Sequence, residues 1–304
     1  FFFKQKTAYE IVDCDWSSDV CSSDLLHIVD IMERAGLPKG VLNLVMPEKV
    51  GPQISKMLHD PRVKNLSFTG STEVGKLLIK EAADQVIRCS MELGGNAPVI
   101  VLDDANIQTA VSGIILAKMR NGGAACTSAN RIFVQKGIAE EFLAAFTKAM
   151  DAFVMGRGTD QGVTLGAYVS LKERDKIAAL VDEAIKSGAS VRTGGKKPDG
   201  PGAFYPATVM TVDKYNSILK HEIFGPVAPI VIFDTDEEGI TLANDTEFGL
   251  ISYVFSGELG RAIRTAEAME SGMVAINKGV ISDPAAPFGG RSEEHTSELQ
   301  SQST

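Results

Sequence analysis

The chain has 304 residues, of which 44% are hydrophobic, and a formal net charge of −9 at pH 7. This size supports a large core and one or two domains, and the negative charge argues against a nucleic-acid-binding protein. No apolar run approaches the roughly 18 residues that span a bilayer, so no membrane association is expected. Four irregularly spaced cysteines do not suggest a disulfide framework, which makes a reducing, cytoplasmic setting the default, and no metal site is expected.

The two ends of the chain differ from the rest. Residues 1–25 have an aromatic start and a Ser/Asp-rich end, and residues 291–304 are polar throughout. Both resemble translated sequencing-adapter DNA, because one DNA string encodes RSEEHTS and its reverse complement encodes DVCSSDL. Two disordered natural tails are the alternative. We expect both segments to lie outside the fold, which leaves Cys89 and Cys126 as the cysteines of interest.

Apolar periodicity predicts alternating helices and strands over residues 26–290. Runs with 3.6-residue spacing indicate helices, and short apolar runs bounded by turn residues indicate parallel strands. In chain order we predict a helix at 26–36, strands at 41–45 and 65–70, a helix at 71–83, strands at 86–91 and 98–102, a helix at 106–119, a strand at 131–135, helices at 139–155 and 171–187, a strand at 227–233, a helix at 237–244, a strand at 252–255, a helix at 259–270 and a strand at 273–276. Strands separated by helices of this length predict βαβ units and an α/β fold with mostly parallel sheets.

Three motifs carry candidate chemistry. The stretch FTGSTEVG, residues 68–75, joins a strand to a helix N-terminus, where backbone N–H groups attract phosphate. A simple helix cap is the alternative, and the common G-x-G-x-x-G fingerprint is absent. The stretch MELGGNAP places Glu92 in an apolar segment, where a buried carboxylate has a raised pKa and can act as a base. A partly exposed acid at a strand end is the alternative.

The third motif, NGGAAC, ends in Cys126 after a run of small residues. Structural cysteines usually sit among larger apolar side chains, and a lone cysteine is more often structural than catalytic. Small neighbours leave room for a substrate to approach the sulfur, so Cys126 is also a candidate nucleophile. A free thiol is mostly protonated at pH 7, so such a site must favour the thiolate or supply a base.

Taken together and in this order, the motifs resemble the aldehyde dehydrogenase superfamily across residues 26–290. The resemblance includes LSFTGSTEVGK, MELGGNAPVIVLDDA, GAACTSANR, HEIFGPVAPI, ANDTEFGL and APFGG, and the 34-residue separation of Glu92 and Cys126. It implies a partial Rossmann-type cofactor domain at residues 26–93 and an α/β catalytic domain at residues 94–277. Residues 278–290 would begin the return to the cofactor and oligomerisation region.

The resemblance implies oxidation of an aldehyde with NAD or NADP. Cys126 would form a thiohemiacetal, which becomes a thioester when a hydride leaves for the nicotinamide, and Glu92 would activate the water that releases the acid. The backbone N–H of Cys126 would help to hold the oxyanion. The cofactor-binding residues implied are Gly70 and Ser71 at the pyrophosphate, Glu222 at the nicotinamide ribose with Phe224 beside it, and Gly75 and Leu93. For Glu222 and Phe224 the alternatives are a turn acid and a core aromatic.

The substrate class follows from the branch that the chain resembles. The stretches KMRNGGAACTSANR and VISDPAAPFGG are most similar to bacterial succinate-semialdehyde dehydrogenases, in which an arginine and a serine bind the substrate carboxylate. Arg120 and Ser282 stand at those places, and the planar fork of an arginine suits a carboxylate. A helix-capping role is the alternative for Arg120.

Some features depart from the family. The resemblance implies that the portion before Leu26 is missing, with the oxyanion asparagine, a cofactor-binding lysine and a second substrate arginine, and that the oligomerisation region is cut at Gly290. We therefore expect a fragment of a homo-oligomeric enzyme with little activity of its own. One alternative is a CoA-acylating semialdehyde dehydrogenase, although that branch usually lacks a glutamate at the position of Glu92. A non-catalytic binding or structural protein on the same fold is the other alternative.

Overall fold

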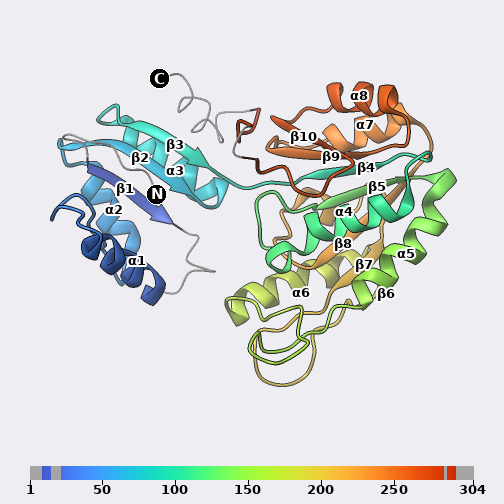
Figure 1. Ribbon diagram of the computed structural model, residues 1–304, viewed down its shortest axis with the longest axis horizontal. Coiled ribbons are helices and arrows are strands. Elements are labelled where there is room, and N and C mark those ends of the chain that lie inside the picture. The colour runs from blue at the N-terminus through green and yellow to red at the C-terminus, as the bar shows by residue number, and fades with distance from the viewer. Residues whose placement is uncertain (1–8, 15–21, 284–285, 292–304) are drawn as a thin grey trace. The chain divides into compact units, whose positions relative to one another are not determined.

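The computed structural model describes residues 9–14, 22–283 and 286–291. Two compact units are present, and the boundary between them falls between Leu93 and Gly94. Both units are α/β and their sheets are almost entirely parallel (Figure 1). The fold class predicted from the sequence is therefore confirmed.

The first unit is a three-stranded parallel sheet with helices. The strands lie in the order β1 (Tyr9–Cys14), β2 (Val63–Thr69) and β3 (Arg88–Glu92). The helices are α1 (Ser22–Arg34), α2 (Val50–Leu58) and α3 (Thr72–Ala83). The core of this unit contains four almost fully buried side chains, Leu58 of α2, Leu66 and Phe68 of β2, and Met91 of β3. Burial of these apolar side chains stabilises the packing of the helix on the sheet.

Two predictions for this unit are wrong. Residues 41–45 form no strand, and Val41 and Val45 are more than half exposed, so this apolar run is not part of the sheet β1-β2-β3. The prediction that residues 1–25 lie outside the fold fails for Tyr9–Cys14, which forms β1, and for the start of α1 at Ser22. An apolar run becomes a strand only where an edge is available to pair with it.

Helix α2 was not predicted, although the sequence carries a signal for it. Ile54 and Leu58 are four residues apart and both are buried, and Pro52 stands in the first turn. Proline is tolerated there because the first N–H groups of a helix have no partner within the helix. The shortness of the helix, nine residues, hides its periodicity.

Val86 ends helix α3 in a strained conformation. Its φ is 52°, and its side chain is 90% exposed. The N–H of Val86 donates to Ala83 O at 3.1 Å and that of Ile87 to Ala82 O at 3.0 Å. This pattern is the C-terminal helix cap at which glycine is the preferred residue.

We expect Val86→Gly to raise the free energy of unfolding of the first unit by about 1 kcal/mol, since a β-branched side chain is penalised in the left-handed region. Val86→Ala, which keeps a Cβ, should recover less than half of that gain. Urea denaturation of the three proteins measures the difference. A loss of stability in the glycine variant would contradict the assignment of strain.

The second unit is a seven-stranded sheet in the order β10-β9-β4-β5-β8-β7-β6, with only β6 antiparallel. Its strands are β4 (Pro98–Val101), β5 (Arg131–Gln135), β6 (Ser190–Thr193), β7 (Thr208–Thr211), β8 (Val227–Phe233), β9 (Ile251–Phe255) and β10 (Met273–Ile276). The sequence analysis missed β6 and β7, because each has four residues and they flank a Gly/Pro-rich loop.

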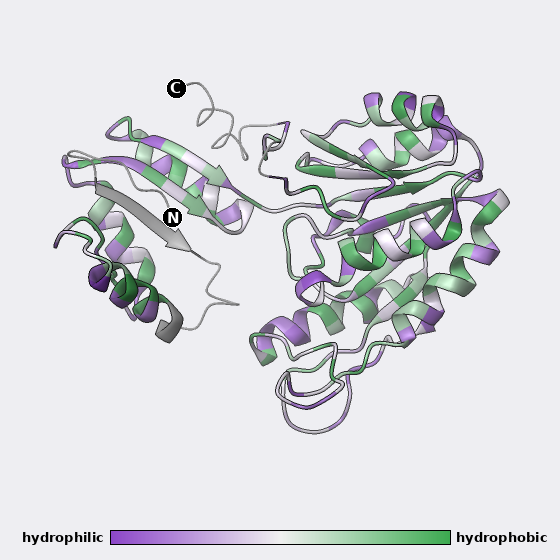
Figure 2. Cartoon of the chain, in the orientation of Figure 1, coloured by the Kyte–Doolittle hydropathy of each residue, from purple (hydrophilic) through white to green (hydrophobic). Residues whose placement is uncertain are grey.

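Helices cover both faces of this sheet (Figure 1). The helices are α4 (Ile107–Met119), α5 (Ala139–Asp151), α6 (Leu171–Lys186), α7 (Asp236–Asn244) and α8 (Leu259–Glu267). One apolar cluster joins α4 and α5 to one face, and a second joins α6 and α7 to the other. Strands β4 and β8 are apolar along their whole length, and β5 is apolar between Arg131 and Gln135 (Figure 2), as expected for parallel strands buried on both faces.

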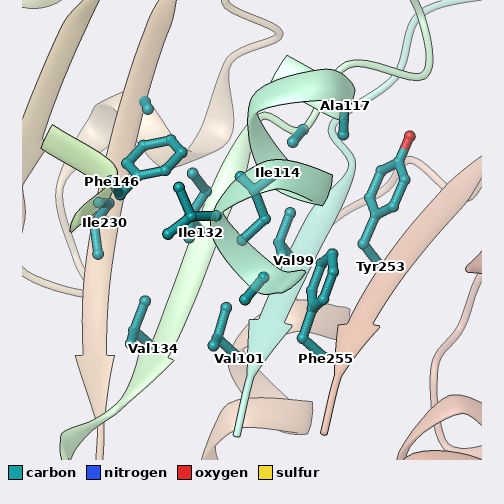
Figure 3. Packing of buried hydrophobic residues seen from close by; sticks show 14 of the residues in the cluster. Val99, Val101, Ile114, Ala117, Ile132, Val134, Phe146, Ile230, Tyr253 and Phe255 are labelled. Atoms are coloured by element: carbon teal, nitrogen blue, oxygen red, sulfur yellow. The ribbon is translucent and has the colours of Figure 1, made fainter. Parts of the chain in front are cut away.

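Alternation along the central strands supplies both clusters. Val99 and Val101 of β4 face α4, together with Ile132 of β5 (Figure 3), whereas Ile100 and Phe133 belong to the opposite cluster. Side chains of successive strand residues point to opposite faces of a sheet. The core therefore fixes α4, and with it the loop that follows α4, against the centre of the sheet.

Arg291 belongs to the second unit, although the sequence analysis placed it in the tail. Its N–H donates to Gly249 O at 3.0 Å, and its guanidinium pairs with Glu270. The prediction that residues 291–304 lie outside the fold is therefore wrong at its first position, and residues 292–304 lie outside the described residues.

Candidate active site

A tight turn presents Cys126. Helix α4 ends at Met119, and a short 3-10 turn, Arg120–Gly123, follows. Asn121, Gly122 and Gly123 have φ values of 52°, 61° and 85°. The turn is closed by Ala124 N donating to Asn121 O at 3.0 Å and by Asn121 Nδ2 donating to Ala124 O at 3.1 Å. Three consecutive left-handed residues explain the Asn-Gly-Gly sequence.

Close backbone contacts also require glycine at Gly95 and Gly123, for a reason separate from the left-handed turn. A Cβ on Gly95 would lie 2.2 Å from the carbonyl oxygen of Cys126, and a Cβ on Gly123 would lie 2.3 Å from that of Gly225. Neither distance is possible for a real side chain. The sequence analysis attributed the small residues to access to the sulfur, whereas Gly95 and Gly123 are required because three loops touch backbone to backbone.

Cys126 is a free thiol, partly buried and packed against the α4 cluster. The segment after it is bound to the last turn of α4, since Ser128 Oγ donates to Lys118 O and Ala129 N donates to Ala117 O, both at 3.3 Å. These bonds satisfy carbonyls that a helix C-terminus leaves without partners. The position of Cys126 is therefore tied to both α4 and β5.

Tyr253 is bonded to the segment that carries Cys126. The Tyr253 hydroxyl donates to Thr127 O at 2.7 Å, and Figure 3 shows its ring beside α4. Burial raises the pKa of this hydroxyl, the Arg120 guanidinium lowers it, and a thiolate at Cys126 raises it further. The charges of both groups therefore act on one phenol, which is hydrogen-bonded to the residue after Cys126.

Ser282 is exposed on the segment that returns along α4. A Cβ on Gly279 would lie 1.9 Å from the carbonyl oxygen of Gly113 in α4, so this segment contacts the helix that leads to Arg120. Seven helical residues advance about 10 Å, and the three residues from Gly279 to Ser282 span at most about 10 Å. The segment is thus long enough to reach the Arg120 end of α4.

Glu222 and Phe224 stand on the loop before β8. The N–H of Gly95 donates to Glu222 Oε1 at 2.8 Å. Phe224 has a φ of 55° and is 37% exposed, so it is not the core aromatic that the sequence left open. Aromatic residues seldom adopt the left-handed region, and those that do are concentrated at functional sites.

These residues gather at the amino ends of three strands. The loops that contain Gly95, Cys126 and Glu222 lead directly into β4, β5 and β8, which are parallel neighbours. The amino ends of parallel strands meet at one edge of a sheet, and the contacts above join all three loops there. Residues more than 125 positions apart in sequence, such as Gly95 and Glu222, are therefore neighbours.

A buried arginine reinforces this edge. Arg131 is 2% exposed, and its guanidinium donates to Asn96 O at 3.1 Å, Ala243 O at 2.8 Å and Leu242 O at 3.1 Å. Burial lowers the pKa of Arg131 to about 10, while Asp245 raises it, so the side chain is charged at neutral pH. A cation at the C-terminus of α7 is favourable, and it connects that helix to the Gly95 loop.

The sequence analysis missed three buried polar residues at this edge, Asn96, Asn130 and Arg131, which are each at most 3% exposed. They stand shortly before or at the start of β4 and β5, whose middle residues are apolar. A polar residue at such a place must be hydrogen-bonded when it is buried, which is the signal that could have identified them.

The first unit places its predicted site residues at the carboxyl ends of β2 and β3. Ser71 caps α3 by accepting from Val74 N at 3.4 Å, and Gly70 N donates to Glu92 O at 3.0 Å. Glu92 is partly exposed at the end of β3, which is the alternative that the sequence left open. A Cβ on Gly75 would lie 2.5 Å from the Leu93 side chain, so these two residues pack on each other.

The enclosed cavity beside this edge is not a substrate site. It has a volume of about 10 Å³ and is lined by Asn96, Thr246 and Ser252, among others. One water molecule needs about that volume, so an aldehyde does not fit. In the described part of the chain, no group of three His, Cys, Asp or Glu side chains could hold a metal ion. Nor does any described helix combine the length and apolarity of a membrane span.

A family model for the aldehyde dehydrogenase family matches residues 17–300. The chain belongs to the aldehyde dehydrogenase family. The family predicted from the motifs is confirmed by this match, which also reaches into both of the segments that the sequence analysis set aside.

Individual relatives agree with the family. The chain is 49% identical over 260 residues to a succinate-semialdehyde dehydrogenase from Paenarthrobacter nicotinovorans, covering 85% of this chain and 58% of the relative. It is 46% identical to a probable succinate-semialdehyde dehydrogenase [NADP(+)] from Sinorhizobium fredii, covering 86% and 53%. The crystal structure of succinate-semialdehyde dehydrogenase from Burkholderia pseudomallei superposes with a TM-score of 0.87 at 42% identity, covering 90% and 56%. The chain spans a little over half the length of these relatives.

Proposed function

We propose that this sequence, completed to the length of its relatives and called the full-length protein below, oxidises an aldehyde that carries a carboxylate, namely succinate semialdehyde, to the dicarboxylic acid. The observation that supports the proposal is that Arg120 and Cys126 stand on one short connection, whose two ends are joined by the 3.3 Å hydrogen bond from Ser128 Oγ to Lys118 O. A guanidinium next to the nucleophile binds a carboxylate at the far end of a short substrate. Two of the relatives are named for this substrate.

In the proposed reaction the Cys126 thiolate attacks the aldehyde carbon and forms a thiohemiacetal, while Arg120 and Ser282 hold the distal carboxylate. The N–H of Cys126 donates to the developing oxyanion. NAD or NADP supplies the oxidant by accepting a hydride from the substrate carbon. Cys126 then carries the acyl group as a thioester, and Glu92 removes a proton from the water that hydrolyses it.

The residues of the first unit fit a nicotinamide dinucleotide. Ser71 caps the N-terminus of α3, and a helix N-terminus has N–H groups available to a phosphate. The hydroxyl of Thr72, the next residue, is buried and has no hydrogen-bond partner among the described residues. An unsatisfied buried donor at that position favours an anionic ligand. Gly70 and Ser71 would hold the pyrophosphate, and Glu222, with Phe224 beside it, would hold the nicotinamide ribose.

The roles of Gly75 and Leu93 in cofactor binding remain predictions, and their mutual packing supports a role in shaping the cofactor unit.

Glu92 stands three residues before Gly95, which contacts the Cys126 carbonyl. A cytoplasmic location and a homo-oligomeric assembly are likewise part of the proposal, supported by the family resemblance.

Substitution of Arg120 tests the substrate class. Arg120→Ala in the full-length protein should raise KM for succinate semialdehyde more than tenfold, because a charge-assisted hydrogen bond contributes about 1.5–3 kcal/mol. It should hardly change kcat/KM for butanal, which has no carboxylate. Steady-state kinetics with both aldehydes measures the difference.

Arg264→Ala is the matched control, since the Arg264 side chain is 72% exposed and forms a surface ion pair with Glu258. It should leave both substrates unaffected. Equal losses on succinate semialdehyde and butanal in Arg120→Ala would show that Arg120 is structural and would overturn the carboxylate assignment.

A further inference from the structure

The side chain of Asn130 holds the residues on both sides of Glu222. Asn130 is 3% exposed. Its Nδ2 donates to His221 O at 2.7 Å, and its Oδ1 accepts from Ile223 N at 3.2 Å. Both partners lie more than 90 positions away in the sequence. The contacts therefore join the segment after Cys126 to the loop that carries Glu222.

The arrangement imitates strand pairing. A neighbouring strand would offer an N–H to the carbonyl of one residue and a carbonyl to the N–H two residues later. The Asn130 amide offers the same pair of groups to residues 221 and 223, and so fixes the backbone direction at residue 222. Because Asn130 and Ile223 are buried, loss of the bond between them leaves an unsatisfied polar group.

A second asparagine completes the connection. Asn130 Nδ2 also donates to Asn96 Oδ1 at 2.7 Å, and Asn96 Nδ2 donates to Leu219 O at 3.0 Å. The neighbour of Asn96, Gly95, donates its N–H to Glu222 Oε1 at 2.8 Å. The backbone around Glu222 and its carboxylate are thus held from the same two loops, which precede β4 and β5.

We propose that Asn130 is a positioning residue for Glu222, and that through Glu222 it sets the affinity of the enzyme for its nicotinamide cofactor. The proposal rests on the proposed function, because it takes the Glu222 carboxylate as the ligand of the nicotinamide ribose. Asn130 does not itself touch cofactor or substrate in this role.

The test compares Asn130→Ala with Asn216→Ala in the full-length protein. Asn216 is a matched control, because it is 5% exposed and its amide also makes two bonds in this region, from Nδ2 to Ala184 O and from Ile218 N to Oδ1. It holds the start of the same segment without contacting residues 221–223. We expect both variants to lose thermal stability, but only Asn130→Ala to raise the Kd for NAD or NADP about tenfold with KM for the aldehyde unchanged.

A double-mutant cycle with Glu222→Gln separates positioning from a structural effect. If Asn130 acts through Glu222, adding Asn130→Ala to Glu222→Gln should change the cofactor Kd less than twofold. Should Asn130→Ala fail to fold, Asn130→Ser, which keeps a polar atom in the site, is measured in the same cycle.

The outcomes are distinguishable. A cofactor Kd that is unchanged in Asn130→Ala but raised in Glu222→Gln overturns the positioning role alone, as do fully additive effects. An unchanged Kd in Glu222→Gln overturns the proposed function of Glu222 and with it the positioning proposal. The positioning role is supported if the cofactor Kd rises tenfold in Asn130→Ala but not in Asn216→Ala, and if adding Asn130→Ala to Glu222→Gln changes the Kd less than twofold.

Discussion

Cys126→Ala in the full-length protein should reduce aldehyde oxidation by at least about 10⁴-fold, because removal of a catalytic nucleophile abolishes the covalent route. The fold should survive, since the thiol is partly exposed and alanine fits the same turn. Initial rates with succinate semialdehyde and either cofactor measure the loss, and circular dichroism confirms the fold.

Cys89→Ala is the control, because Cys89 is also a free thiol and is partly buried in the first unit. It should retain activity within about twofold. Residual turnover of a few per cent or more in Cys126→Ala would rule out Cys126 as the nucleophile.

Glu92→Gln should behave differently from Cys126→Ala. If Glu92 only activates the hydrolytic water, the variant should release one equivalent of reduced cofactor in a burst and then turn over slowly. Rapid mixing with cofactor absorbance at 340 nm separates the two phases. A burst lost together with the steady-state rate would contradict the general-base role.

Lys118→Met should stabilise the second unit by on the order of 4 kcal/mol at pH 7. Lys118 is fully buried, and its amine has no hydrogen-bond partner among the described residues. Burial lowers the pKa of Lys118 to about 7 from the ordinary value of 10.5. Methionine has a similar length and needs no proton or hydrogen bond.

The pH dependence has a definite sign. Between pH 7 and 10.5 the unfolded chain binds a proton at Lys118 that the folded chain has released, so stability rises with pH. The penalty for burying the Lys118 amine is absent above pH 10.5, where the amine is neutral in both states, and is fully present at about pH 7. Between these values the free energy of unfolding changes by about 1.4 kcal/mol per pH unit. Lys118→Met should remove this slope.

Urea denaturation at several pH values from 7 to 10 measures the pH dependence of stability in the wild type and in Lys118→Met. Lys176→Met is the matched control, because Lys176 lies on an exposed helix position, and its effect should stay within about 0.5 kcal/mol. A wild-type stability that is flat over this range, together with no gain in Lys118→Met, would show that the buried amine finds a partner.

The sequence by itself determined the family, the α/β class and the identity of the candidate site residues. The repeated order of apolar runs and helical periods predicted most elements, because strands buried on both faces must be apolar throughout. The motifs around Glu92 and Cys126 pointed to the chemistry because each places a reactive group close to small residues, whereas Glu222 was identified only through the resemblance to the family. These signals are local, and a single stretch of chain carries each of them.

The tertiary structure alone decided which residues hold the site together. Gly95 and Gly123 are glycines because of backbones from distant segments, and Asn130 matters because of a loop more than 90 residues later. The pairing of Tyr9–Cys14 with β2 likewise depended on an available edge, which no local pattern shows. Steric contact and hydrogen bonding act through space, so the reason for a small or buried polar residue appears only when the segments that it touches are in place.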